Sequence, residues 1–188
     1  MSSFFTEEEL KVIPFKSIGK NVKISRKASI YTPEEIEIGD NVRIDDFCIL
    51  SGKIKIGSHI HIAAYSALYG KYGIIIEDFV NISGRVSIYS SSDDFSGEYL
   101  ISPVIPEEFT GGIKGTVTLK KHSIIGAGTI VMPNLIIGEG TAVGALSFVN
   151  KSLKDWYIYS GIPAKPLKPR KKNILELEKK FLEFWKKQ

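Results

Sequence analysis

IEIGDNVRIDDFCIL, residues 36–50, carries an aliphatic residue at every sixth position, at Ile38, Ile44 and Leu50. The same spacing recurs along most of the chain, in triplets that begin at residues 18, 38, 56, 76, 119 and 137. Successive triplets therefore begin 20, 18, 20, 43 and 18 residues apart. Helices have an apolar period of about 3.6 residues, and a doubly wound sheet needs helical stretches between its strands, so the pattern argues against both.

Each triplet is interpreted as one coil of three short strands. Side chains alternate across a strand, so positions one and five of a six-residue unit point to the same, inward side. Position five is apolar or small in most units, as at Val22, Val42 and Cys48. Pairs such as Gly39-Asp40 and Gly57-Ser58 suit the corners, because glycine tolerates positive φ. Six coils in register predict an all-β parallel β-helix around an aliphatic ladder, in preference to an antiparallel sandwich of short strands.

The composition is that of one folded domain with small appendages. The 188 residues are 43% hydrophobic and 24% charged, and the single cysteine, Cys48, excludes an internal disulfide and fits a reducing compartment. No signal-peptide pattern and no window of eighteen consecutive apolar residues is found, so membrane insertion is not expected. The net charge is +4, with lysines gathered near the C-terminus that suit nucleic acid, a membrane surface or the phosphates of a small ligand. Nucleic acid is disfavoured, because aromatic residues do not alternate with these lysines.

Two terminal segments are expected to flank a β-helix of residues 18–153. In residues 1–17, Thr6 is the predicted N-cap of a short helix, and Glu9 completes a capping box. Phe5 is expected to pack on Leu10. In residues 154–188, the sequence NILELEKKFLEFWKK predicts an amphipathic helix that covers an open coil edge or a neighbouring subunit. Its apolar face would consist of Ile174, Leu177, Phe181 and Phe184 or Trp185.

The repeat is interrupted after Ile88, and residues 89–116 are expected to form a long loop. Its first part, Ser90-Ser91-Ser92-Asp93-Asp94, is followed by Glu98. Long irregular loops in a compact solenoid are usually functional, which makes these carboxylates candidate site residues. The alternative interpretation is a solvated turn, in which serine and aspartate side chains cap their own backbone.

The repeat units themselves resemble a known superfamily. Ile125-Gly126-Ala127-Gly128-Thr129-Ile130 and the later Ser160-Gly161-Ile162-Pro163-Ala164-Lys165 resemble the left-handed β-helix acyltransferases of the hexapeptide-repeat superfamily, over about residues 18–170. Residues 42–47 and 90–94 are most similar to the dTDP-4-amino-4,6-dideoxyglucose N-acyltransferases, which acylate sugars for surface polysaccharides. The resemblance implies a left-handed parallel β-helix, a homotrimer with active sites between adjacent subunits, and an acyl-CoA co-substrate.

The resemblance also draws attention to the absence of histidine from the loop. In similar sugar O-acetyltransferases a loop histidine is the general base, whereas here Asp93 or Asp94 stands where that histidine would fall. A hydroxyl needs such a base, but a neutral amine is already nucleophilic and mainly needs positioning. Asp94 or Glu98 is expected to hold the amine, and a carboxylate with a raised pKa would also accept its proton. The pattern favours N-acylation over O-acylation.

By the same resemblance, the coenzyme A donor is expected on the last coils and on the basic positions after them. The small side chains of Ala127 and Ala145 would admit the pantetheine arm, and the remaining contacts would come from Asn150, Lys151, Lys165 and Lys168. Lysine is a sound partner for phosphate, although solvated lysines would give the same pattern. Arg85 is expected to meet a nucleotide phosphate and His61 to touch the acceptor, with ordinary surface positions as the alternative for both.

The sequence thus predicts a cytoplasmic N-acyltransferase that uses acetyl-CoA or another acyl-CoA and a nucleotide-linked 4-amino-4,6-dideoxy sugar. No metal is expected, because His59, His61 and His122 fall short of the ligand set of a zinc-dependent β-helix. One alternative is a sugar O-acetyltransferase, in which Asp94, Glu98 or His61 would serve as base. Another is a noncatalytic β-helix scaffold, which would bind no coenzyme A. The sugar, its nucleotide and the acyl group are left open, as is whether Asp94 is a base or only positions the acceptor.

Overall fold

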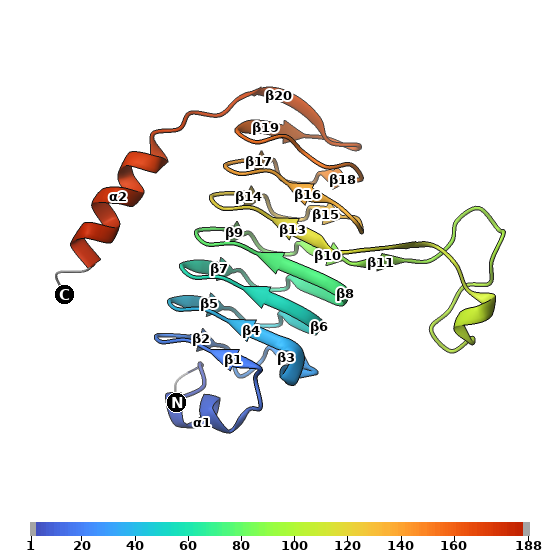
Figure 1. Cartoon of the computed structure of the whole chain (residues 1–188), viewed down its shortest axis with the longest axis horizontal. Coiled ribbons are helices and arrows are strands. Elements are labelled where there is room, and N and C mark those ends of the chain that lie inside the picture. The colour runs from blue at the N-terminus through green and yellow to red at the C-terminus, as the bar shows by residue number, and fades with distance from the viewer. Residues whose placement is uncertain (1–2, 186–188) are drawn as a thin grey trace.

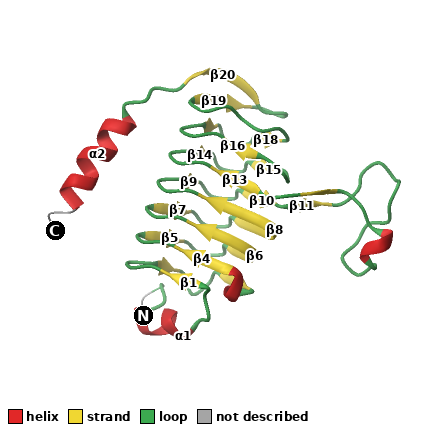
Figure 2. Ribbon diagram, viewed as in Figure 1, coloured by secondary structure: helices red, strands yellow, loops and turns green. Residues whose placement is uncertain are grey.

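The computed structural model describes residues 3–185, which form the predicted left-handed parallel β-helix, with helix α1 (Glu7–Val12) before it and helix α2 (Ile174–Trp185) after it (Figure 1). A long arm leaves the stack of coils about halfway along and returns to the same place (Figure 1). Apart from the two α-helices and the short 3-10 turns at Pro33–Glu35 and Glu107–Phe109, the described chain is strand and loop (Figure 2). Neither α-helix has the length and hydropathy that crossing a bilayer requires.

The coils stack into a prism with three parallel sheets, which we call faces 1, 2 and 3 in the order in which each coil crosses them. Face 1 contains β1 (Ser17–Ile18), β4 (Ile36–Ile38), the second halves of β6 (Ile49–Ile56) and β8 (Ala67–Ile76), β13 (Val117–Leu119) and β16 (Ile136–Ile137). Face 2 contains β2 (Lys23–Ile24), β5 (Val42–Ile44), β7 (Ile60–Ile62), β9 (Asn81–Ile82), β14 (Ile124–Ile125), β17 (Ala142–Val143) and β19 (Tyr157–Ser160). Face 3 contains β3 (Ser29–Tyr31), the first halves of β6 and β8, β10 (Ser87–Tyr89), β15 (Ile130–Val131) and β18 (Phe148–Val149).

The core is the aliphatic ladder that the six-residue spacing predicts. On face 2, Ile44 pairs with Ile62, which pairs with Ile82, and all three side chains are fully buried. Position-five residues such as Val42 and Cys48 are buried beside them, while the first coil is less covered at Ile18 and Ile30. Because each inward side chain is packed by the coils above and below, burial along the axis stabilises the whole stack cooperatively.

Corner A, between faces 1 and 2, differs from the sequence expectation. Gly39 and Gly57 were expected to supply positive φ, but the left-handed residues are Asn41 (φ 57°) and His59 (φ 59°), two positions later. The glycines are needed for space instead, because a Cβ on Gly39 would lie 2.7 Å from the backbone of Gly57 in the next coil. A Cβ on Gly57 would lie 2.5 Å from Oδ1 of Asp78. The close approach of stacked coils, rather than the turn conformation, therefore explains these glycines.

The N-terminal segment forms the capping box predicted for it. The backbone N–H of Glu9 donates to Thr6 Oγ1 at 3.3 Å, and the backbone N–H of Thr6 donates to Glu9 Oε2 at 2.7 Å. Arg26 also donates to both carboxylate oxygens of Glu9, and these bonds, with the Thr6 backbone N–H, lower the pKa of Glu9 to about 2. Leu10 is buried and Phe5 packs against the core, so α1 covers the first coil.

The C-terminal segment adds two strands to the stack before it forms helix α2. The parallel ladder continues past residue 153 to β19, and β20 (Lys165–Pro169) pairs antiparallel with β19 at the end of face 2. Helix α2 does not cover an open coil edge but runs beside the stack, along corner A (Figure 1). The ring of Phe181 meets His59 edge-on at 5.1 Å between centroids and Phe79 at 6.0 Å.

One carboxylate holds α2 to corner A. Glu178 accepts hydrogen bonds from Lys121 at 2.6 Å and His122 at 2.7 Å, and the side chains of Glu178 and His122 are mostly buried. Burial would raise the pKa of Glu178, but the bonds from Lys121 and His122 outweigh it and lower that pKa. Because the pKa of Glu178 is lower in the folded protein than in the unfolded chain, its hydrogen bonds stabilise the docking of α2 at pH values above the ordinary carboxyl pKa. This stabilisation is lost as the pH falls through the lowered pKa of Glu178.

Glu178→Gln is expected to weaken the docking of α2 by about 2 kcal/mol, because two charge-assisted hydrogen bonds lose their anion. Hydrogen exchange of the α2 amides at neutral pH should become faster, and lowering the pH should have the same effect on the unmutated protein. Glu176→Gln is the matched control, since Glu176 pairs with Lys179 on the exposed side of the same helix. Equal exchange rates of the α2 amides in Glu178→Gln and Glu176→Gln would contradict the assignment of Glu178 as the residue that holds α2 to corner A.

Candidate active site

The arm, residues 90–116, leaves the prism at corner C, between faces 3 and 1 (Figure 1). It starts as a two-stranded antiparallel ribbon, in which β11 (Ser91–Ser92) pairs with β12 (Ile113–Lys114). Ser90 anchors the base: its buried hydroxyl donates to the Tyr69 carbonyl at 2.8 Å and accepts from the Tyr72 backbone N–H at 2.9 Å. The first residues of the arm are therefore tied to the rigid stack.

A cavity of about 770 Å³ lies where the arm leaves face 3. Its floor is made of outward side chains of face 3, with the rings of Tyr69 and Tyr89 stacked at 5.1 Å. The arm contributes the polar residues of the edge, Ser91, Ser92 and Asp93. The complete lining is Tyr69, Tyr89, Ser91, Ser92, Asp93, Phe95, Pro103, Ile130, Met132 and Phe148. This site joins a mostly apolar wall to one carboxylate and has no histidine in its lining.

The neighbouring carboxylate, Asp94, is used by the arm itself. Its oxygens accept hydrogen bonds from the Ser96 hydroxyl at 2.8 Å and from the backbone N–H groups of Gly97 at 2.8 Å and Glu98 at 3.1 Å. The Ser96 hydroxyl bond, followed by the backbone bonds, lowers the pKa of Asp94. Asp94 thus forms the solvated turn that was the alternative sequence interpretation, and Glu98 is exposed beyond it. The oxygens of Asp94 are engaged by the turn, whereas Asp93 is the aspartate that lines the cavity.

Corner B, between faces 2 and 3, carries three of the residues expected at the donor. Ala127 and Ala145 occupy equivalent places in successive coils, both exposed, with the Leu146 backbone N–H donating to the Ala127 carbonyl at 2.8 Å. Lys165 pairs with Ser160 at the last coil of the same corner. Asn150 and Lys151 follow β18 at the opposite edge of face 3. One subunit therefore gathers part of the predicted donor set at corner B and leaves the rest near corner C.

Lower coils of corner B form an exposed ladder of rings and cations. Phe47 stacks on Tyr65 at 4.9 Å, and the guanidinium of Arg85 lies over the Tyr65 ring at 5.6 Å. On the adjoining face 2, Asp45 accepts from His61 at 2.7 Å and from Arg43. The predicted acceptor residues Arg85 and His61 thus lie in one region, beneath the alanines of the donor set.

Ser83, which the sequence analysis did not single out, lies at corner B in the coil between those two regions. It occupies in its coil the place that Gly126 has in the next, and its backbone N–H donates to the Ile125 carbonyl at 2.9 Å. Small polar residues are common at the corners of a solenoid, so nothing in the sequence distinguishes Ser83 from the other residues at such corners. Ser83 and Asp93 lie at opposite edges of face 3 within one chain.

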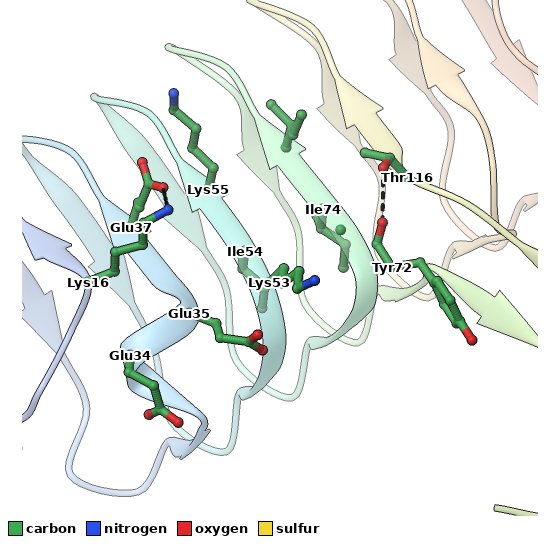
Figure 3. A pocket seen from close by; sticks show the side chains of 12 residues that line it. Lys16, Glu34, Glu35, Glu37, Lys53, Ile54, Lys55, Tyr72, Ile74 and Thr116 are labelled. Atoms are coloured by element: carbon green, nitrogen blue, oxygen red, sulfur yellow. Dashed lines mark hydrogen bonds and ion pairs between the residues drawn. The ribbon is translucent and has the colours of Figure 1, made fainter.

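A second groove, of about 520 Å³, lies on face 1 beside corner C (Figure 3). Lys16 and Glu37 form an ion pair at one end of it, with 2.6 Å between the charged atoms, and at the other end the Thr116 hydroxyl donates to the Tyr72 carbonyl (Figure 3). None of the sequence-predicted site residues lines it. In the described residues, no group of three or more histidine, cysteine, aspartate or glutamate side chains is arranged to hold a metal ion.

Comparisons with known proteins agree with this geometry. No family model matches the chain. It is 51% identical over 182 residues, 95% of both chains, to the dTDP-4-amino-4,6-dideoxy-D-glucose acyltransferase of Escherichia coli. It is 27% identical over 150 residues, 77% of this chain and 74% of the other, to a protein of Escherichia coli (strain K12) named "Putative lipopolysaccharide biosynthesis O-acetyl transferase WbbJ".

Solved structures give the same result. The N-acyltransferase AntD of Bacillus cereus, in complex with dTDP and 3-hydroxybutyryl-CoA, is 58% identical, covers 99% of this chain and 100% of its own, and superposes with a TM-score of 0.97. A variant of AntD in which a serine is replaced by cysteine has been solved in complex with dTDP-4-amino-4,6-dideoxyglucose and coenzyme A. It is 59% identical over 97% of this chain and 98% of its own, with a TM-score of 0.96. The chain belongs to the dTDP-4-amino-4,6-dideoxyglucose N-acyltransferases of the left-handed β-helix superfamily.

Proposed function

We propose that the protein transfers an acyl group from a coenzyme A thioester to the 4-amino group of dTDP-4-amino-4,6-dideoxyglucose. The observation that carries this is that AntD, which matches this chain over nearly its whole length, holds that nucleotide sugar together with coenzyme A. The arm cavity supports it independently, because it offers a carboxylate and no histidine to the acceptor.

The chemistry suits an amine acceptor. The amine nitrogen attacks the thioester carbonyl, the new C–N bond forms, the C–S bond breaks, and coenzyme A leaves as the thiolate. The proton that the nitrogen loses passes to Asp93 or to the leaving thiolate. A hydroxyl acceptor would need a base in place before attack, and an amine needs chiefly to be oriented with its lone pair towards the carbonyl.

The assignment of Asp93 and Ser83 to the active site is also supported by solved variants of AntD. AntD has been solved with a substituted serine and with a substituted aspartate, and those two residues are ten positions apart in its chain. Ser83 and Asp93 are the only serine and aspartate in this sequence that have that order and separation. The aspartate variants of AntD hold dTDP and coenzyme A, which fits a role at the amine rather than in nucleotide binding.

Steady-state release of coenzyme A thiol tests the function itself. With acetyl-CoA and then longer acyl-CoA donors, turnover is expected with dTDP-4-amino-4,6-dideoxyglucose and not with its 4-hydroxy counterpart, because the cavity lacks a histidine base. Turnover with the hydroxy sugar alone would favour the O-acyltransferase alternative. Binding of neither coenzyme A nor the nucleotide sugar would favour the noncatalytic scaffold.

Asp93→Asn is expected to lower kcat roughly a hundredfold, as removal of a group that handles the acceptor proton does. The arm should stay folded, with unchanged amide exchange over residues 94–99. Asp94→Asn is the matched control, because it disturbs the turn and should speed exchange there. A variant of Asp93 with unchanged kcat, or loss of activity in Asp94→Asn without a change in exchange, would contradict the assignment of roles.

We propose that the active unit is a homotrimer, in which the arm of one subunit lies against corner B of the next. A single subunit leaves the arm uncovered, with Phe95 91% and Val104 88% exposed. It also keeps Ser83 and Asp93 apart, and a cyclic arrangement would bring Asp93 of one copy to Ser83 of another. A cytoplasmic site of action is supported by the buried, unpaired thiol of Cys48.

Light scattering is expected to give the mass of a trimer for the unmodified protein. Val104→Asp should shift it towards smaller species, because it places a charge in a contact that excludes water. Val12→Asp is the matched control, since Val12 is 81% exposed on α1, far along the chain from the arm. A monomeric unmodified protein with full activity would contradict the trimer.

A further inference from the structure

We propose that the groove between helix α2 and face 2, the α2 groove, binds a small organic anion, a carboxylate carried by an aromatic or short aliphatic body. The groove lies at corner A, and none of the residues assigned to the donor, the acceptor or the arm lines it. Its volume is about 440 Å³. Pockets that hold small molecules span about 300–1,000 Å³, so the α2 groove has the size of a ligand site.

Most of the groove surface is apolar. Its floor contains Asn81 and Ile124, which point outward from face 2 and are paired in register in neighbouring coils. Helix α2 forms the opposite wall with Ile174, Leu177 and Phe181. Leu177 is 53% exposed, so the groove is open to solvent along the helix. A hydrocarbon or aromatic body that covers this surface would remove it from water, which favours binding.

The anion is expected at Arg170, which also lines the groove. The Arg170 backbone N–H donates to the Trp156 carbonyl at 2.8 Å. The side chain is held as well, because Nη1 donates to the carbonyls of His122 at 2.9 Å and Gly140 at 3.0 Å. Nε and Nη2 make no hydrogen bond to the part of the chain that the structure describes. The guanidinium is therefore fixed in place, with the pair of nitrogens that can hold a carboxylate by two parallel bonds.

The positive charge of Arg170 is not balanced by the protein. Within residues 3–185 no carboxylate forms an ion pair with it, and burial lowers the pKa of Arg170 with no acidic neighbour to raise it again. Glu178 lines the same groove, but its oxygens already accept hydrogen bonds from Lys121 and His122. Charges that are taken out of water in proteins are normally paired. A ligand carboxylate would supply the missing partner.

The groove fits a monocarboxylate better than a phosphate. A phosphate group carries between one and two negative charges and three strong acceptor oxygens near neutral pH. Arg170 is the one cationic guanidinium in the lining, and the other polar side chain of the floor, Asn81, is uncharged. One guanidinium beside an apolar wall matches one carboxylate on an apolar body, which is the ligand class that we propose.

The test compares 4-phenylbutyrate with its neutral analogue 4-phenylbutyramide, by ligand-observed NMR titration of the full chain. Saturating coenzyme A and dTDP keep both probes out of the proposed active site. The acid should bind with a Kd of about 1 mM or tighter, and the amide at least about fivefold more weakly, because it cannot form charge-assisted bonds as an anion. Bound acid should also slow amide exchange in α2, since it joins the helix to face 2.

Two pairs of variants locate the site. Ile124→Trp should weaken binding of the acid at least about fivefold, because the indole fills the groove, and Ile136→Trp, an outward isoleucine of face 1, should not. Arg170→Gln should bring the ratio of the two Kd values to about one, whereas general loosening of the chain end would weaken both probes equally. Lys172→Gln is its control, since Lys172 is a nearby cation that lies over the Trp156 ring at 5.2 Å, and the ratio should not change.

Four results would overturn the inference: no binding of the acid, equal affinity for acid and amide, equal binding by Ile124→Trp and Ile136→Trp, or slower exchange in the arm in place of α2. None of these measurements needs a folded Arg170 variant. Each result would leave the proposed acyl transfer standing, because no residue of the α2 groove takes part in that reaction.

Discussion

The stacking of each coil on the coil below it is the constraint on which the rest of the structure depends. Main-chain pairing and the inward aliphatic ladder leave no room for an inserted residue inside the prism, so an insertion must leave and return at one corner. The arm meets this condition. Tyr89, just before it, pairs with Tyr69, and Val117, just after it, pairs with Ile74 on the same long strand, β8. Faces 1 and 3 therefore keep their register, and a long irregular segment is held on a rigid base.

The coils and the arm contribute different groups to the candidate site. The coils supply a flat wall and a corner lined by small residues, which suit an extended thioester and an apolar group. The arm supplies polar groups that no regular coil position could bring over face 3. Within the arm the two adjacent aspartates have different surroundings: Asp94 accepts hydrogen bonds from its own turn, and Asp93 lines the cavity. An amine acceptor makes a histidine unnecessary, so a single positioned carboxylate is sufficient.

The residues that point into the core could be predicted from the sequence, because burial between stacked coils admits few residue types. Ile44, Ile62 and Ile82 show this. The roles of the residues that point outward from the coils could not be predicted in the same way, because solvent-facing positions accept almost any residue. The roles of Gly39 and of helix α2 depend on contacts between coils that the spacing does not reveal. The break in the repeat predicted the arm, in which the candidate site lies. It could not distinguish Asp93 from Asp94, which differ only in their hydrogen bonds, and it held no signal for Ser83.

The central claim is that each active site takes its corner from one subunit and its arm from another, and mixed trimers test it most directly. Two chains whose own trimers have no site with both residues intact, Ser83→Ala and Asp93→Asn, would be produced together with different affinity tags, and trimers that contain both would be isolated. The account predicts that activity returns to about one third of that of the unmodified protein, because every cyclic trimer that contains both chains has one interface of three with both intact residues. Mixed trimers no more active than either parent would show that Ser83 and Asp93 do not act across a subunit interface, and would contradict the account.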